Sequence, residues 1–340
     1  MQRAVLSWAM MLCCACGQWT LDPESCAEIP RERMSRLPSK LSETGLFSDI
    51  AGDTTADGVR PFTPQFQLWS DGASKRRWIL LPAGTQIDTR NADFWLFPEG
   101  TKLWKEFTRD GKRVETRLIQ KVGPNPEDWA AQAYIWNGEG TDALAAPDGA
   151  QNAGGTPHDV PSSTKCMGCH DGTESRALGF SAIQLAYDAP AGSWDLRDLI
   201  DEGRLSSPPD ATIQIPGNEV ERNALGYLHA NCAHCHNLSR PPRKPVEPPP
   251  APMSLPHLPG LEHRCYDPSQ SFDFFLRLGE LGSVEATATY RTAVGSVIDR
   301  GSPEKSAAVK RIRNGEMPPL GVEVVDEAGI EMLSTWIRAL

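Results

Sequence analysis

The sequence has 340 residues, of which 39% are hydrophobic and 23% charged, so it is long enough for two or three domains and too apolar to be wholly disordered. Its formal net charge of −10 argues against a nucleic-acid partner, because phosphate binding requires clustered lysine and arginine. The 29 prolines and 29 glycines favour long irregular connections over a compact helical bundle.

The first fifteen residues have the features of an export signal. Arg3 supplies a positive charge, and residues 4–15 form an uncharged apolar run that is too short to span a bilayer. The sequence LCCACG at 12–17 is similar to a bacterial lipobox, which would place a lipid on Cys16, and an ordinary cleaved signal peptide is the alternative. We therefore expect a signal over 1–15 and an exported, periplasmic protein whose only attachment to the membrane is this lipid.

The nine cysteines fall into three groups. Three lie at the signal boundary, four lie in the two motifs described below, and Cys26 and Cys265 remain. An oxidising compartment would allow a disulfide between Cys26 and Cys265, and two unpaired thiols are the alternative.

The segment before residue 150 has the sequence pattern of a β domain. Residues 16–60 are polar and rich in turn formers, which predicts an irregular linker. Residues 61–149 contain short apolar runs bounded by turn residues, and Asp110-Gly111 between two such runs predicts a hairpin. Six of the ten tryptophans fall in this segment: Trp69, Trp78, Trp95, Trp104, Trp129 and Trp136. We expect an antiparallel β-sandwich with these aromatic side chains in its core.

The rest of the chain has helical patterns that are interrupted by prolines. Asn218 followed by Glu221 predicts a capping box at the start of a helix that runs into a cysteine motif. Ser302-Pro303 predicts the start of another helix. Apolar residues at helical spacing predict a final helix over 327–339.

Two Cys-x-x-Cys-His motifs carry the chemistry: CMGCH at 166–170 and CAHCH at 232–236. This pattern is typical of c-type haem attachment, in which two thiols bond to the vinyl groups of one porphyrin and the histidine ligates the iron. Cysteines three residues apart project from one helix end, so both can reach the same porphyrin. We predict two covalently bound haems. The thioether residues would be Cys166, Cys169, Cys232 and Cys235, and the axial residues would be His170 and His236.

Two other uses of paired cysteines fit the sequence less well. Zinc ribbons also pair Cys-x-x-Cys motifs, but usually within ~15–20 residues of each other. Here 66 residues separate Cys166 from Cys232 (232 − 166). A thioredoxin-like motif would require a surrounding βαβ pattern, which the sequence does not show.

A sixth ligand is suggested for only one of the two irons. Met317 precedes two prolines that stiffen its loop, and the order of helix, motif, long loop, Met-Pro-Pro and final helix is similar to a class I cytochrome c. Met317 would then ligate the second haem, and an ordinary core methionine is the alternative. The candidates for the first haem are His158, His229, His234 and Met167, each of which could instead be a structural residue. No role is predicted for His257 or His263.

With these residues in hand, the chain resembles a family of exported bacterial di-haem c-type cytochromes, largely uncharacterised conserved hypothetical lipoproteins. The resemblance covers most of residues 40–340. It rests on LSETGLF at 41–47, RPFTPQFQLWSDGASKRRWILLP at 60–82, YLHANCAHCHN at 227–237 and the closing segment at 301–330. It implies haem attachment at both motifs, with Met317 as the axial methionine. The chain departs from the family at 241–252, where PPRKPVEPPPAP replaces a loop of small residues, so partner contacts are not carried over.

These observations combine into one expectation for fold and function. The fold would be an N-terminal β-rich, sandwich-like domain over 61–149, followed by mainly α cytochrome c-like haem modules over 150–217 and 218–340. The function would be single-electron transfer in the cell envelope between redox partner proteins of unknown identity. The alternatives are a di-haem peroxidase-like enzyme with one open iron, and a redox-sensing or binding lipoprotein whose tryptophan-rich domain holds a partner.

Overall fold

A computed structural model describes residues 37–239, 272–318 and 323–340, together with the backbone of 18–20 and 265–267. Cys16, Cys26, His257, His263 and the side chain of Cys265 lie outside the described residues, so the lipid site and the disulfide stay predictions. Within the described part of the chain, none of the helices combines the length and the apolar character that a bilayer span requires.

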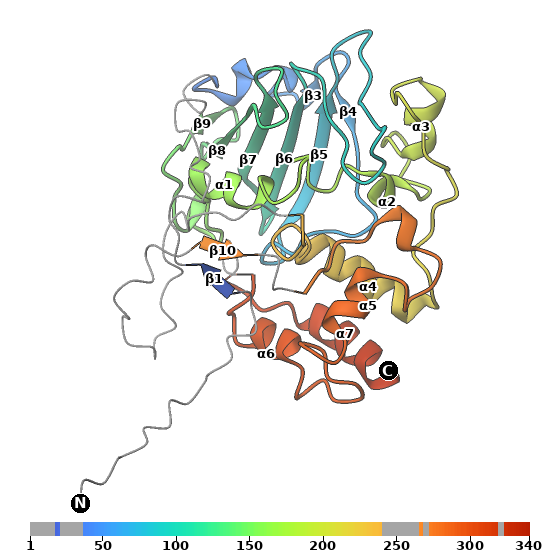
Figure 1. Cartoon of the computed structure of the whole chain (residues 1–340). Coiled ribbons are helices and arrows are strands. Elements are labelled where there is room, and N and C mark those ends of the chain that lie inside the picture. The colour runs from blue at the N-terminus through green and yellow to red at the C-terminus, as the bar shows by residue number, and fades with distance from the viewer. Residues whose placement is uncertain (1–17, 21–36, 240–264, 268–271, 319–322) are drawn as a thin grey trace, which may run out of the picture.

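A six-stranded antiparallel sheet organises the first half of the chain (Figure 1). Each strand pairs with the next one along the chain, which gives a meander. The strands are β4 (Arg60–Pro61), β5 (Ser74–Leu80), β6 (Lys102–Arg109), β7 (Lys112–Lys121), β8 (Trp129–Trp136) and β9 (Ala143–Ala145). Asp110 and Gly111 join β6 to β7 with positive φ values of 49° and 76°, so the predicted hairpin is confirmed.

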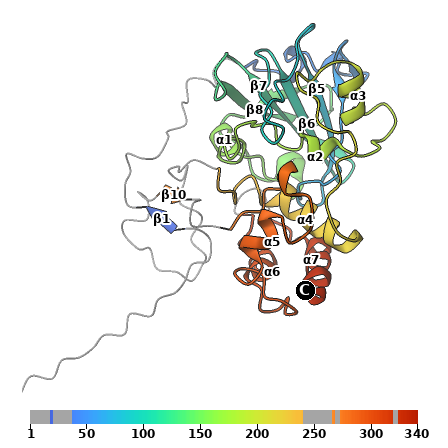
Figure 2. The same cartoon turned by 45° about the vertical axis from the view of Figure 1, so that its right-hand side comes forward.

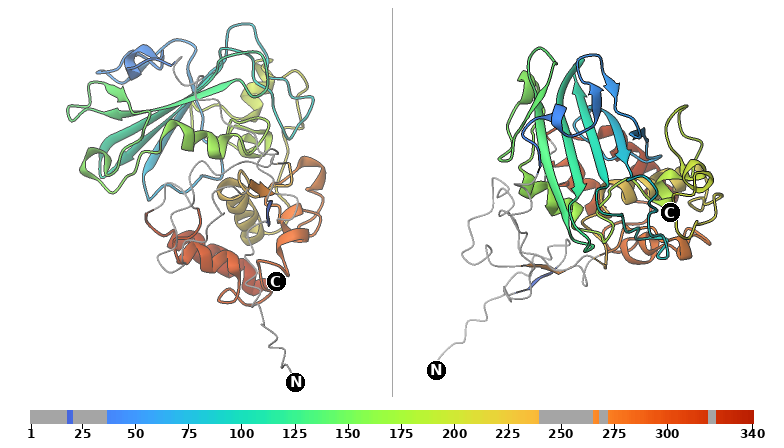
Figure 3. Two further views of the ribbon diagram at one scale, coloured as in Figure 1. Left: turned by 60° about the vertical axis from the view of Figure 1, so that its left-hand side comes forward. Right: turned by 90° about the horizontal axis from the view of Figure 1, so that it is seen from above.

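The two faces of this sheet bury different cores, because successive side chains of a strand point to opposite sides. Trp78, Trp104 and Trp136 pack on one face, against residues of the segment that precedes the sheet. The other face carries Ile79, Leu103 and Ile119, and helices cover it (Figure 3). These covering helices are α1 (Ser163–His170), α2 (Ala182–Leu185) and α3 (Leu196–Asp201).

A further core lies among the helices below the sheet (Figure 2). They are α4 (Glu219–Asn231), α5 (Ala288–Ala293), α6 (Ala307–Arg313) and α7 (Glu327–Ala339). Leu225 and Leu228 of α4 share this core with Leu333 and Trp336 of α7. The remaining short elements are β1 (Gln18–Thr20) paired with β10 (Cys265–Asp267), β2 (Phe47–Asp49) paired with β3 (Thr54–Thr55), and the 3₁₀ turns Leu41–Glu43, Ala153–Gly155 and Leu278–Glu280.

The predicted fold class is wrong. The β region is one open sheet with helices on one face, not a sandwich of two sheets. The regions that follow are not mainly α cytochrome c-like modules: α4 and α7 have thirteen residues each, and every other described α-helix has eight or fewer. Apolar segments broken by proline and glycine cannot form long helices, and those of 150–217 instead bury Phe180 and Leu185 against the sheet.

Two of the three helix predictions made from local sequence signals are confirmed. Asn218 Oδ1 accepts from the Glu221 backbone N–H (3.1 Å), and Glu221 Oε2 accepts from the Asn218 N–H (2.7 Å), so the capping box at the start of α4 is confirmed. The final helix, α7, has the predicted bounds of 327–339. The helix expected from Ser302 begins only at Ala307, because the residues before it form a turn.

Candidate functional site

The first motif is presented by α1, which packs on β8 of the sheet. Ser162 caps the helix by accepting from the Lys165 N–H (3.4 Å). Cys166 and Met167, which are 8% and 3% exposed, point into the sheet core. Met167 is thus part of the core beneath the sheet. Burial also raises the pKa of the Cys166 thiol to about 11, so the thiol is protonated at neutral pH.

The histidine of the first motif is held in a ligand-competent state. His170 Nδ1 lies 2.6 Å from the carbonyl oxygen of Arg176. A carbonyl can only accept, so Nδ1 carries the proton and Nε2 keeps its lone pair. Burial lowers the pKa of His170 to about 4, which keeps the ring neutral at pH 7. A neutral imidazole oriented through N–H to a carbonyl is the arrangement found around metal-bound histidines.

The second motif follows directly from the end of α4. Cys232 caps that helix, and the His236 N–H donates to the Cys232 carbonyl (2.8 Å). The His236 ring stacks on Phe272 with a centroid separation of 4.8 Å, and Phe274 approaches it edge-on at 6.1 Å. The aromatic contacts set the plane of the imidazole, as a hydrogen bond does for His170.

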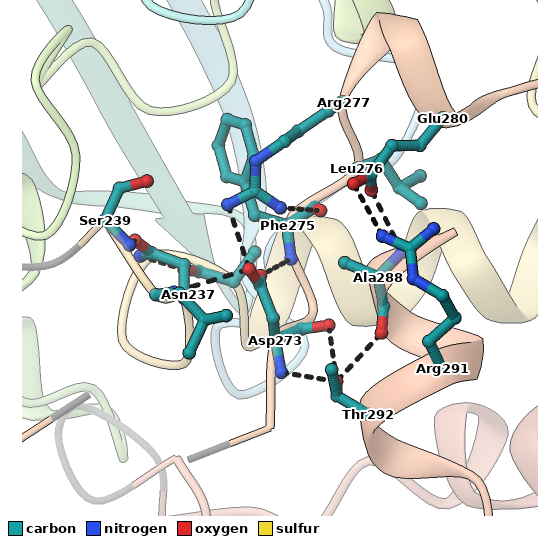
Figure 4. Close-up of polar contacts among 12 residues, drawn as sticks. Asn237, Ser239, Asp273, Phe275, Leu276, Arg277, Glu280, Ala288, Arg291 and Thr292 are labelled. Carbon is teal, nitrogen blue, oxygen red and sulfur yellow. Dashed lines mark hydrogen bonds and ion pairs between the residues drawn. The ribbon is translucent and has the colours of Figure 1, made fainter. Parts of the chain in front are cut away.

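A buried carboxylate positions the segment that carries these phenylalanines (Figure 4). Asp273 is 0% exposed; its oxygens accept from the N–H groups of Phe275 (2.8 Å) and Leu238 (3.3 Å) and from Arg277 Nη2 (2.9 Å). Its own N–H donates to Thr292 Oγ1 (2.8 Å) on α5. Asp273 thus ties the loop after His236 to the helical core. Asp273 could not be predicted from the sequence, because a lone acidic residue among phenylalanines carries no specific signal.

The fold brings the two motifs together. Cys169 Sγ, Cys235 Sγ and a ring nitrogen of His234 all lie within 4.8 Å of one another. Asn237, which is fully buried, joins the motifs by donating from Nδ2 to the carbonyls of Gly172 (3.0 Å) and Ala233 (2.7 Å). Neither this convergence nor the role of Asn237 was predicted.

The other candidate ligands are held differently. His234 is the one that lies beside the cysteines. His158 Nε2 lies 2.8 Å from Glu115 on the sheet. His229 Nδ1 accepts from the Leu276 N–H (3.2 Å), so its single proton sits on Nε2, the nitrogen that ligation would need. Met317 is half-buried just after α6, where its N–H donates to the Arg311 carbonyl (3.1 Å), and its ligation of iron stays a prediction.

His229 gives the fold a dependence on pH. Burial, followed by the charges of His234 and Arg277, lowers its pKa from 6.5 to about 4. The unfolded chain therefore takes up the proton first as the pH falls, and stability is lost between pH 6.5 and about 4. We expect His229→Gln, whose amide oxygen can still accept from Leu276, to reduce the stability lost between pH 7 and pH 5 by about 1–2 kcal/mol in urea titrations. Equal losses in both proteins would contradict this assignment.

Comparison with known proteins adds no relative: no family model matches the chain, and neither a curated protein nor a solved structure is significantly similar to it. The resemblance to di-haem cytochromes stays a prediction, and the function has to be argued from the geometry of the two motifs.

Proposed function

We propose that this protein is a di-haem c-type cytochrome that transfers single electrons in the bacterial cell envelope, exported and attached to the membrane by a lipid on Cys16. The observation that carries the proposal is the convergence of two Cys-x-x-Cys-His motifs, with Cys169 and Cys235 side by side. Two such motifs in contact supply two sets of thioether and imidazole residues at one place.

The donor set of each motif suits a haem. Cys166, Cys169 and His170 would hold the first, and the Nδ1 proton of His170, directed at a carbonyl, leaves Nε2 for iron. Cys232, Cys235 and His236 would hold the second, with the imidazole plane set by Phe272. The haems would supply the redox chemistry, since their irons alternate between two oxidation states, while the chain sets their access and surroundings.

The closeness of the two motifs supports a relay in which electrons pass from one haem to the other. Cys169 Sγ and Cys235 Sγ are within 4.8 Å of each other, so groups attached to them would be neighbours. Sixth ligands remain predictions: Met317 for the second haem, and His234 as the histidine that the fold brings to the cysteines. An electron-transfer protein would have both irons fully ligated, whereas the peroxidase-like alternative requires one open iron.

One observation favours a second candidate, a single metal ion held by Cys169, His234 and Cys235. Thiolate and imidazole ligands within 4.8 Å of one another are the donors that zinc prefers. Such a site would consume a thiol from each motif, so it excludes haem attachment at both. The two candidates therefore make opposite predictions for the isolated protein.

The deciding experiment is expression of the full chain, with its signal, in a bacterial host that carries a cytochrome c maturation system. We expect an intact mass increased by two haems, a c-type visible spectrum and two irons per chain. Carbon monoxide should not bind readily to the reduced protein, and ready binding would favour the peroxidase-like alternative. A colourless protein without added haem mass overturns the proposal, and one zinc per chain would support the second candidate.

A further inference from the structure

Three cationic side chains form a row across the sheet. Arg77 of β5 lies directly opposite Lys105 of β6, and Lys105 lies directly opposite Arg117 of β7. Residues opposite each other on antiparallel strands point to the same face. Like charges in such positions repel each other, so this cationic row (Arg77, Lys105 and Arg117) destabilises the sheet unless an anion faces it.

The row has few anionic partners of its own. Glu115 accepts from Arg117 Nε (2.6 Å) and also contacts His158. In the part of the chain that the structure describes, neither Arg77 nor Lys105 forms a salt bridge. Arg77 is 6% exposed, and its guanidinium donates to Gln67 Oε1 at a long 3.4 Å. Lys105 Nζ lies 4.8 Å from the centre of the Phe107 ring.

Neighbouring Lys75 is satisfied by other groups and does not belong to the row. Its ammonium donates to the Leu68 carbonyl (2.6 Å), and the charges of Asp71 and Asp326 act on it.

Desolvation by burial lowers the pKa of Arg77 to about 10 and holds the pKa of Lys105 well below its ordinary value. Arg77 is buried and Lys105 and Arg117 are half-buried, so an anion bound to the row would offset the cost of removing these cations from water.

The row faces the first motif. It shares its sheet face with Leu103 and Ile119, which pack in one core with Cys166. The helix that carries this motif, α1, packs on β8, the strand next to β7, which carries Arg117. An anion on the row would therefore lie beside the group attached at this motif.

We propose that the cationic row binds the two propionate carboxylates of the haem attached at Cys166 and Cys169. This assignment depends on the proposed haem function. The charges match once all three side chains of the row are protonated: three cations less the one negative charge of Glu115 leave two positive charges, and two propionates carry two negative charges. Lys105, for which the described residues supply no side-chain hydrogen-bond acceptor, stands at the middle of the row.

The test uses two variants of the same strand. Lys105→Met removes the central cation, whereas Lys102→Met removes a cation on the opposite face, where Lys102 Nζ donates to the Thr44 carbonyl (2.7 Å). A cation beside the propionates favours the reduced haem, which carries one more electron. In spectroelectrochemical titrations of the haem-loaded protein, we expect Lys105→Met to lower the potential of one haem by ~59 mV, a tenfold change for a one-electron couple. Lys102→Met should leave both potentials unchanged.

Two further experiments distinguish the propionate site from the haem function itself. Arg77→Gln should shift the same haem in the same direction, which provides a result if Lys105→Met does not fold. If the wild-type protein carries no haem, calorimetric titration with succinate tests the row as a site for a free dicarboxylate. If succinate binding weakens tenfold in Lys105→Met but not in Lys102→Met, the row is an anion site in a protein that carries no haem. Unchanged potentials in both row variants, or no succinate binding to a haem-free protein, would overturn the inference.

Discussion

Replacing Cys232 and Cys235 together by serine is expected to give a protein with one covalent haem instead of two. If each cysteine pair holds its own porphyrin, as proposed, the first motif should still be modified when the second cannot be. Intact mass spectrometry of the exported protein measures the loss directly. The matched variant, Cys166→Ser with Cys169→Ser, should also retain one haem, but with the reduction potential of the other iron.

The same pair of variants distinguishes haems from a shared metal ion. Cys169 and Cys235 belong to different motifs but to one cluster with His234. If that cluster binds a single ion, either double variant should lose all bound metal, whereas two haems should be lost one at a time. Cys265→Ser serves as the control and should keep both haems. An all-or-none loss in metal analysis would refute the di-haem proposal.

Asp273→Ala is expected to lower the free energy of unfolding by about 3–5 kcal/mol, because it leaves the Arg277 cation without its buried partner. The substitution also removes the acceptor of the Phe275 and Leu238 N–H groups, and with it the side-chain tie to the loop after His236, whereas the backbone bond to Thr292 is kept. Chemical denaturation measures the loss. The haem content of the second motif should fall too, since Phe272 would no longer set the plane of the His236 ring.

A surface ion pair supplies the control for this prediction. Arg338 and Glu331 of α7 form a salt bridge in which the side chains are 57% and 69% exposed. Because such pairs are screened by solvent, Glu331→Ala should cost less than about 1 kcal/mol. Asp273→Asn, which keeps an acceptor but loses the charge, should fall between the two alanine variants. Equal effects of Asp273→Ala and Glu331→Ala would show that the Asp273 network does not hold the fold.

Features decided by neighbouring residues could be predicted from the sequence. Asp110-Gly111 accepts the positive φ values of a tight hairpin, and Asn218 with Glu221 satisfies the first N–H groups of α4, whatever the rest of the chain does. The paired cysteines were found in the same way, because their spacing is itself the signal.

The tertiary arrangement could not be predicted, because it depends on which apolar surfaces meet. Phe180 and Leu185 lie in a segment whose pattern fits a small helical module as well as a layer on a sheet, and the fold uses the second solution. The contact of Cys169 with the second motif depends on Asn237 reaching the Gly172 carbonyl across the fold. Asp273 was missed for the same reason, since its partners come from three separate segments.

Under the di-haem proposal, the contact between the motifs also implies an order of events during biogenesis. Once Asn237 has joined the two pentapeptides and Cys166 is covered by the sheet, a maturation enzyme can no longer hold a porphyrin against both thiols. Haem attachment would then have to precede closure, and the exported polypeptide would have to arrive in its compartment unfolded. A chain that folded before attachment could not be loaded with haem afterwards.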